Sequence, residues 1–190
     1  MVLKRKFCAY RRIERPYTRI SKFREKSFVR ARPHTSIARF NMGDLSGYYD
    51  HSVTLIVTQN IQIGDGAIES GRMTALRLLE KKLGKTGYRM DVRLYPHHIL
   101  RENPLASGAG ADRMSQGMAG AFGKVVGIAA RVFQGQPVYT IFTSKNNIDT
   151  AKEALTRSKN KIPCHCQIII EKMAGPTPGQ TARTAVVASA

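Results

Sequence analysis

Alternating apolar and polar residues predict strands in the part of the chain that begins near residue 50. Apolar side chains recur at every second position over residues 53–58 and 90–94. This period is typical of a half-buried strand. The same reasoning predicts further strands over residues 125–133, 138–143 and 162–171.

Two segments have the 3.6-residue period of an amphipathic helix. In residues 66–83 one face carries Ile68, Leu76, Leu79 and Leu83, and Gly84 is suited to end the helix. Residues 147–158 form the second predicted helix, with Asn146 or Asn147 as the N-cap.

The order of these elements predicts an α+β fold with two helices on a mainly antiparallel sheet, in a split-βαβ arrangement. Residues 61–66 are expected to form a turn. We divide the chain into a basic N-terminal arm (1–49), an α+β body (50–172) and a disordered tail (173–190). Residues 103–124 contain five glycines and no apolar period, so they are expected to form a loop of functional importance or high mobility.

Composition narrows the class of protein. The 190 residues are 42% hydrophobic, which is enough for a real core, and no apolar run approaches the roughly 20 residues of a membrane helix. The formal net charge of +18 suits a polyanionic partner. Three cysteines are too few for a disulfide framework and fit a reducing compartment.

The positive charge is concentrated near the N-terminus. Residues 1–40 hold 13 of the 31 lysines and arginines and only two acidic residues. Lysine and arginine contact phosphates and release counterions. Arg89 and Arg93, on the polar face of a predicted strand, are expected to extend this basic surface. The candidate phosphate-binding residues are Lys4, Arg5, Lys6, Arg11, Arg12, Arg15, Arg19, Lys22, Arg24, Lys26, Arg30, Arg32, Arg39, Arg89 and Arg93.

Aromatic side chains are interleaved with these arginines, and two interpretations stay open. They can stack on unpaired bases, or they can pin an extended arm onto the body. The six aromatics of this segment are Phe7, Tyr10, Tyr17, Phe23, Phe28 and Phe40.

Enzymatic and metal-binding motifs are incomplete. Cys164 and Cys166 would share one strand face and His165 the other, so reduced thiols are favoured over zinc. His97, His98 and Glu102 could act as an acid–base group on RNA, but no nucleophile is marked nearby. The near P-loop at residues 118–125 lacks its first glycine and its Ser or Thr, which excludes ATP binding through that motif.

The glycine-rich stretch is also the most recognisable part of the chain. The run Gly110-Ala-Asp-Arg-Met-Ser-Gln-Gly-Met118, followed by Gly120-Ala-Phe-Gly-Lys124, resembles the universal large-subunit ribosomal protein family. That family is called L-sixteen in bacteria and L-ten-e in archaea and eukaryotes, and this chain is most similar to its archaeal branch. Arg15-Pro-Tyr-Thr-Arg19, Phe40-Asn-Met-Gly43 and Ile162-Pro163-Cys164 support the resemblance, which covers about residues 5–172.

The resemblance implies a hammerhead-like α/β fold and a non-enzymatic role in the large ribosomal subunit, in the cytoplasm. It implies large-subunit rRNA, tRNA and neighbouring ribosomal proteins as partners, with no cofactor, metal, membrane or small-molecule substrate. The basic residues given above would bind rRNA. A loop spanning about Ala106–Lys124 would lie near the tRNAs of the A and P sites, beside the peptidyl transferase region.

The residues assigned to that tRNA-proximal loop are Gly108, Gly110, Asp112, Arg113, Met114, Ser115, Gln116, Gly117 and Lys124. Two positions depart from the family pattern. Ala119 stands where many members have an arginine, and Val125 stands where eukaryotic members often have a proline.

Overall fold

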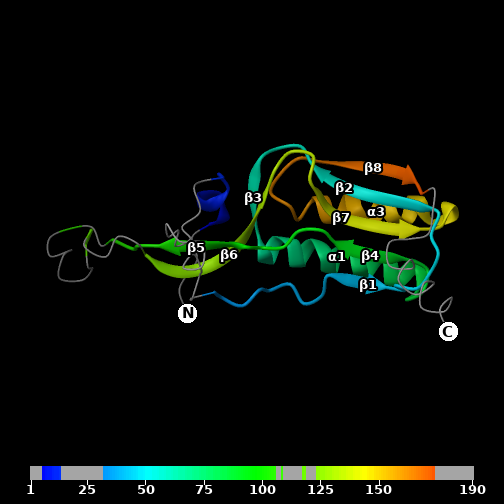
Figure 1. The fold of residues 1–190 in the computed structure, drawn as a ribbon, viewed down its shortest axis with the longest axis horizontal. Helices are drawn as coiled ribbons and strands as arrows, with labels where there is room; N and C mark the ends of the chain where they lie inside the picture. The colour runs from blue at the N-terminus through cyan, green and yellow to red at the C-terminus, as the bar shows by residue number, and fades with distance from the viewer. Residues whose placement is uncertain (1–5, 14–31, 106–107, 109–116, 119–122, 174–190) are drawn as a thin grey trace, which may run out of the picture.

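The computed structural model describes residues 6–13, 32–105, 108, 117–118 and 123–173. These residues form two antiparallel sheets and two α-helices (Figure 1). The α+β class expected from the pattern is therefore confirmed. The predicted tail, from Ala174 on, lies outside the described residues.

The main sheet has five strands in the order β1-β4-β7-β2-β8. Their bounds are β1 (Asn41–Gly43), β2 (His51–Val57), β4 (Arg89–Val92), β7 (Pro137–Thr143) and β8 (Cys166–Lys172). Without β1, the chain runs strand, helix, strand, strand, helix, strand, and every neighbouring pair is antiparallel. This is the predicted split-βαβ arrangement, with β1 added beside β4.

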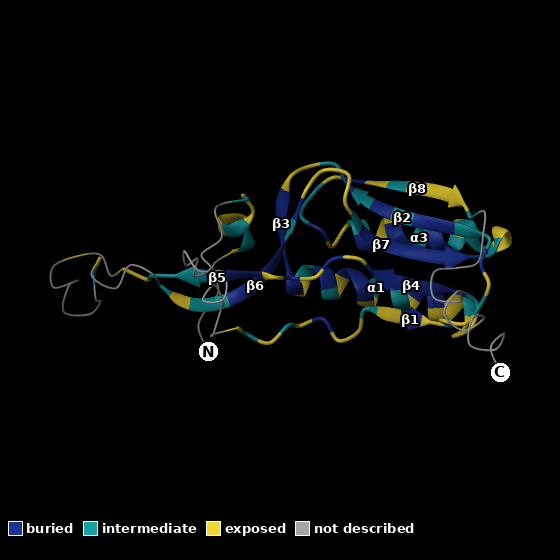
Figure 2. Cartoon of the chain, in the orientation of Figure 1, coloured by how far each residue is buried: buried dark blue, intermediate teal, exposed yellow. Residues whose placement is uncertain are grey.

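The strand register separates two faces of this sheet. Met90, Ile141 and Val53 lie side by side across three strands and belong to the core that also includes the helices. The adjacent row of paired residues, Arg89, Phe142 and Ser52, faces the opposite side of the sheet. In Figure 2 the central strands β2, β7 and β4 are mostly buried, whereas β1 and β8 carry exposed residues at the two edges.

The helices are α1 (Asp65–Leu83) and α3 (Ile148–Lys159). They pack against each other, and Ile68, Leu79 and Leu155 are fully buried in the core. Gly84 follows α1 with φ +70° and returns its N–H to Glu80 O, as expected of a glycine that ends a helix. Asn147 occupies the N-cap position of α3, but its side chain makes no capping hydrogen bond.

A second sheet of three strands, in the order β3-β6-β5, is inserted into this framework. Its strands are β3 (Ile61–Gly64), β5 (His98–Glu102) and β6 (Lys124–Val132). The predicted turn at 61–66 is wrong, because Ile61–Gly64 pairs with the far end of β6 before α1 begins. β5 was not predicted, because its sequence His-Ile-Leu-Arg-Glu does not alternate between apolar and polar side chains. In Figure 1 the β5–β6 pair extends away from the main sheet.

Candidate nucleic-acid interface

A buried glutamine of β3 holds the basic arm on the body. Gln62 is 3% exposed, and its side-chain Nε2 donates to the backbone oxygens of Tyr10 (2.7 Å) and Arg12 (2.9 Å). The Gln62 backbone N–H donates to Arg11 O at 2.9 Å. Three consecutive carbonyls are thus fixed by one residue, so the arm has a defined course at this point.

The aromatic residues of this described segment pack on the protein. Phe7 and Tyr10 belong to the short 3-10 helix η1 (Phe7–Tyr10). Their rings line a small apolar cavity with Gly64, Leu100 and Ile128. A Cβ at Gly64 would lie 2.7 Å from the Phe7 ring, so the close approach requires glycine there. For these two aromatics the structure favours the anchoring interpretation over base stacking.

The cations beside this anchor face outward. Lys6, Arg11 and Arg12 are exposed, and none of them makes an ion pair with another described residue. The other arm cations predicted to bind phosphates lie outside the described residues: Lys4, Arg5, Arg15, Arg19, Lys22, Arg24, Lys26 and Arg30.

A second basic stretch, residues 32–40, runs along the body between those cations and β1. Ser36 is bound to the Asp65 carboxylate through both its N–H (3.0 Å) and its hydroxyl (2.7 Å), and Ile37 is buried. Arg32 donates to the Tyr95 hydroxyl at 2.7 Å, and its guanidinium lies 5.1 Å from the centre of that ring. Arg39 is exposed.

The two arginines predicted on the strand at 89–94 have different surroundings. Arg93 is exposed, as expected. Arg89 is only 9% exposed: its Nη2 and Nε contact Asp91 at 2.9 and 3.1 Å, and its guanidinium lies 5.3 Å from the Phe142 ring. The expectation that Arg89 extends the basic surface is wrong, because Asp91 neutralises it in a buried ion pair.

The glycine-rich loop begins and ends on the β5–β6 pair. Gly123 has φ +72°, and a Cβ there would lie 2.7 Å from the backbone of Glu102. Only glycine therefore fits where the end of the loop passes close to β5. Arg101 Nη1 donates to Gly123 O, and Asn103 Nδ2 donates to Gly117 O, both at 3.3 Å. Lys124 and Gly108 are exposed. The remaining loop candidates lie outside the described residues: Gly110, Asp112, Arg113, Met114, Ser115 and Gln116.

The candidate metal and acid–base residues form no complete site. In the described part of the chain, no three His, Cys, Asp or Glu side chains are grouped to hold a metal. Cys164 and Cys166 have their sulfurs 3.6 Å apart, and the hydrogen bond to Cys166, aided by burial, raises the pKa of the Cys164 thiol. His97 is exposed whereas His98 is 5% exposed, as expected of neighbours on an extended backbone.

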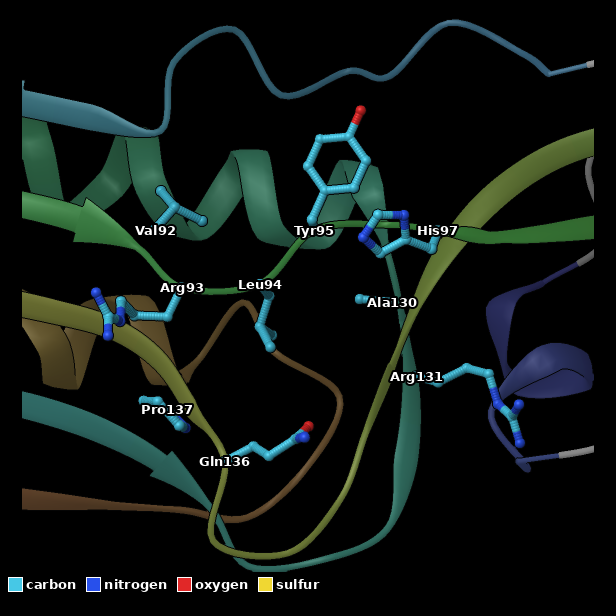
Figure 3. A pocket seen from close by; sticks show the side chains of 9 residues that line it. All are labelled: Val92, Arg93, Leu94, Tyr95, His97, Ala130, Arg131, Gln136 and Pro137. Carbon is cyan, nitrogen blue, oxygen red and sulfur yellow. The ribbon is translucent and has the colours of Figure 1, made fainter.

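A groove that the sequence did not indicate lies where the two sheets meet (Figure 3). Its volume is about 510 Å³. One side is the β4–β5 connection with Arg93, Tyr95 and His97; the other is the β6–β7 turn with Gln136 and Pro137. The positive charge of Arg93 was evident in the sequence. The role of Gln136 was not, because only the tertiary fold brings residues 93–97 and 130–137 together.

No helix in the described ranges has the length and apolar character needed to cross a membrane.

Comparison with known proteins shows which family this chain is similar to. The family model described as "Ribosomal protein L16p/L10e" matches residues 14–169. "Large ribosomal subunit protein uL16" of Methanocella arvoryzae is 45% identical over 150 residues, covering 79% of this chain and 87% of that protein. The proteins of the same name from Methanococcus aeolicus and Archaeoglobus fulgidus are 44% and 40% identical over 164 and 163 residues. These matches cover 86% of this chain and 91% and 90% of those proteins.

These relatives agree with the resemblance found in the glycine-rich motif and with the expectation of a non-enzymatic protein. The chain belongs to the ribosomal protein L16p/L10e family.

Proposed function

We propose that this chain is a cytoplasmic, structural constituent of the large ribosomal subunit that binds large-subunit rRNA and helps to position tRNA near the A and P sites. Its partners are rRNA, tRNA and neighbouring ribosomal proteins. It needs no cofactor or metal and acts on no small-molecule substrate. Three relatives with 40–45% identity bear the name of a large-subunit protein, which supports the ribosomal role.

One structural observation carries the RNA-binding part of the proposal. Gln62 fixes the backbone of residues 10–12, and this leaves Arg11 and Arg12 exposed without acidic partners among the described residues. Cations held on a rigid support bind phosphates with less loss of conformational entropy than cations on a free tail. The N-terminal arm is therefore suited to a fixed course along folded RNA.

The tRNA part of the proposal rests on the placement of the glycine-rich loop. The β5–β6 pair extends from the body and brings Lys124 and the ends of the loop away from the core (Figure 1). Such a support lets a loop enter a cleft between RNA elements while the body stays outside it.

Sedimentation of native lysate at moderate and high salt tests the ribosomal role. We expect one copy per large subunit, retained at high salt. Recovery of most of the protein at the top of the gradient would contradict the proposal and favour a free RNA chaperone.

The arm is tested separately through the salt dependence of binding to transcribed large-subunit RNA. Arg11→Ala with Arg12→Ala should reduce the slope of log K against log salt by about two, one for each phosphate contact. The matched control is Arg77→Ala with Lys81→Ala, which removes two exposed cations from α1. An equal loss in both pairs of variants would show that only total charge matters.

The loop is tested on subunits that carry Lys124→Ala. We expect weaker tRNA binding with unchanged incorporation into the subunit, whereas Lys145→Ala, another exposed lysine, should change neither. Unchanged tRNA affinity in the Lys124 variant would argue against this contact.

A further inference from the structure

We propose that the groove between the β4–β5 connection and the β6–β7 turn holds a single unpaired nucleotide of RNA, turned out of its helix. The inference rests on the proposed rRNA binding and specifies one subsite of it. The groove's volume of about 510 Å³ is in the range of about 300–1,000 Å³ typical of small organic ligands, which is enough for one nucleotide.

An aromatic row borders the groove. The rings of Phe40 and Tyr95 are stacked with centroids 5.3 Å apart, and the His97 ring follows at 4.5 Å from Tyr95. Arg32 fixes the Tyr95 hydroxyl from the far side. In Figure 3 the Tyr95 ring points toward the 32–40 segment and the exposed His97 ring lies beside it at the groove. His97 thus offers a supported ring on which a base can stack.

An oriented amide side chain, whose NH₂ group is a hydrogen-bond donor, lines the groove on the opposite side. Gln136 Oε1 accepts from the Phe133 N–H at 3.0 Å, which orients the side-chain amide that lines the groove. The turn itself is held by hydrogen bonds from Gly135 N to Val57 O and from Val57 N to Gln136 O. This donor is preorganised and can bind an acceptor on a base edge without a large ordering cost.

The charge and the apolar floor of the groove also suit a nucleotide. Leu94 and Ala130, both nearly buried, form an apolar floor, and no acidic residue is among the nine that line the groove. Arg93 lies at one end, exposed and without an ion pair in the described part of the chain. Arg131 extends from the other end toward the arm segment 6–13 (Figure 3). A nucleotide placed here has a cation available for its phosphate and apolar contact for its base.

A peptide carboxylate would also satisfy Arg93, but it would use neither the supported ring nor the oriented amide. An RNA base uses both, because every base has a flat face for stacking and a polar edge for hydrogen bonding. The observations therefore favour an unpaired nucleotide over an acidic peptide.

Binding of the full chain to two short RNA hairpins tests the inference. One hairpin carries a single bulged fluorescent adenine analogue, and the other is fully paired. We expect the wild-type chain to bind the bulged hairpin at least about tenfold more tightly, with a change in the fluorescence of the analogue. Equal affinity for both hairpins would overturn the subsite.

Two test substitutions, each with a matched control, separate the contacts of the groove from the stability of the fold. Gln136→Glu retains the oxygen that accepts from Phe133 N–H but removes the NH₂ donor, so the turn is preserved and the preference for the bulge should be lost. Gln134→Ala, an exposed neighbour outside the groove, is the matched control and should keep the preference. His97→Ala should lose the preference, whereas His165→Ala should keep it.

Several outcomes of these binding experiments would overturn the proposed nucleotide subsite. Loss of the preference in the Gln134 or His165 control, or its retention in Gln136→Glu, would overturn the proposal. So would full competition by free adenosine monophosphate at concentrations comparable to those of the hairpin, since the occupant would then be a free nucleotide. A chain that fails here but still sediments with the large subunit leaves the proposed function intact and removes only the subsite.

Discussion

The Asp91 carboxylate lies 2.9 Å from the Arg89 guanidinium on the same face of β4, and both residues are nearly buried. Residues two apart on a strand share a face, so this pair forms within a single strand. A buried ion pair is tolerated because each charge satisfies the other; removing one partner leaves an uncompensated charge.

Arg89→Met should therefore lower the free energy of unfolding by about 3–5 kcal/mol, and adding Asp91→Leu should recover much of that loss. Urea denaturation of both variants measures this. Arg93→Met, on an exposed arginine, should change stability by less than about 0.5 kcal/mol. A mild effect of Arg89→Met with a large effect of Arg93→Met would contradict the assignment of the two arginines.

Loss of the Gln62 side chain should release the arm. Gln62→Ala leaves the carbonyls of Tyr10 and Arg12 without their buried donor, which costs about 1–3 kcal/mol. Trypsin should then cut faster after Arg11 and Arg12, as followed by mass spectrometry. Gln59→Ala, an exposed glutamine before β3, should not change the cleavage rate. Equal rates in all three proteins would mean that the clamp does not hold the arm.

The packing of α1 on β7 leaves no space at Gly71. A Cβ there would lie 2.5 Å from the Tyr139 hydroxyl, which itself donates to Ile68 O at 2.6 Å. Gly71→Ala should cost about 1–3 kcal/mol through overpacking. Tyr139→Phe in the same chain should relieve part of that cost, a coupling that a double-mutant cycle measures. Gly66→Ala, where no atom lies within 4 Å, should be neutral or stabilising, and a comparable loss there would point to backbone rather than packing effects.

Glu69 should make stability depend on acid pH. The hydrogen bond from Arg72, itself 4% exposed, holds the pKa of the Glu69 carboxyl below its ordinary value of 4.5. A lowered pKa in the folded state means that the stabilising contribution is present above pH 4.5 and is lost as the pH falls through the folded-state value. The stability difference between wild type and Glu69→Gln should shrink accordingly in urea denaturation below pH 4.5. Glu80→Gln, on an exposed glutamate of the same helix, is the control. A difference that stays constant over this range would contradict the role of the ion pair.

Most of the main sheet and both helices were predictable because their signals are local. The periods over 66–83 and 147–158 reflect a helix face buried in the core, and the alternation in 53–58 reflects the same core on the strand side. β3 was missed because the four-residue segment Ile61–Gly64 ends in glycine and is buried on both sides by β6 and the arm, neither of which is close in sequence.

The candidate interface was predictable in its charge but not in its geometry. Alternation correctly placed Arg89 opposite the apolar face, but a period of two does not show whether the second face meets solvent or an aromatic ring and a carboxylate. In the same way, the basic residues of the arm were evident, whereas the roles of Gln62 and Gln136 depend on hydrogen bonds to distant or turn backbone that composition does not reveal.

The position of β8 gives the net charge of +18 a second consequence. Within the described residues β8 pairs only with β2, so its outer edge presents backbone donors and acceptors beside Ile169 and Ile170, which are 37% and 41% exposed. Such an edge is a template for strand pairing between molecules. Mutual repulsion of highly charged copies opposes that association, and it is screened beyond about 10 Å at 0.1 M salt. Salt that weakens binding to RNA therefore also weakens the repulsion between copies of the chain. We expect self-association to be least when the positive charge is either unscreened or neutralised by bound nucleic acid.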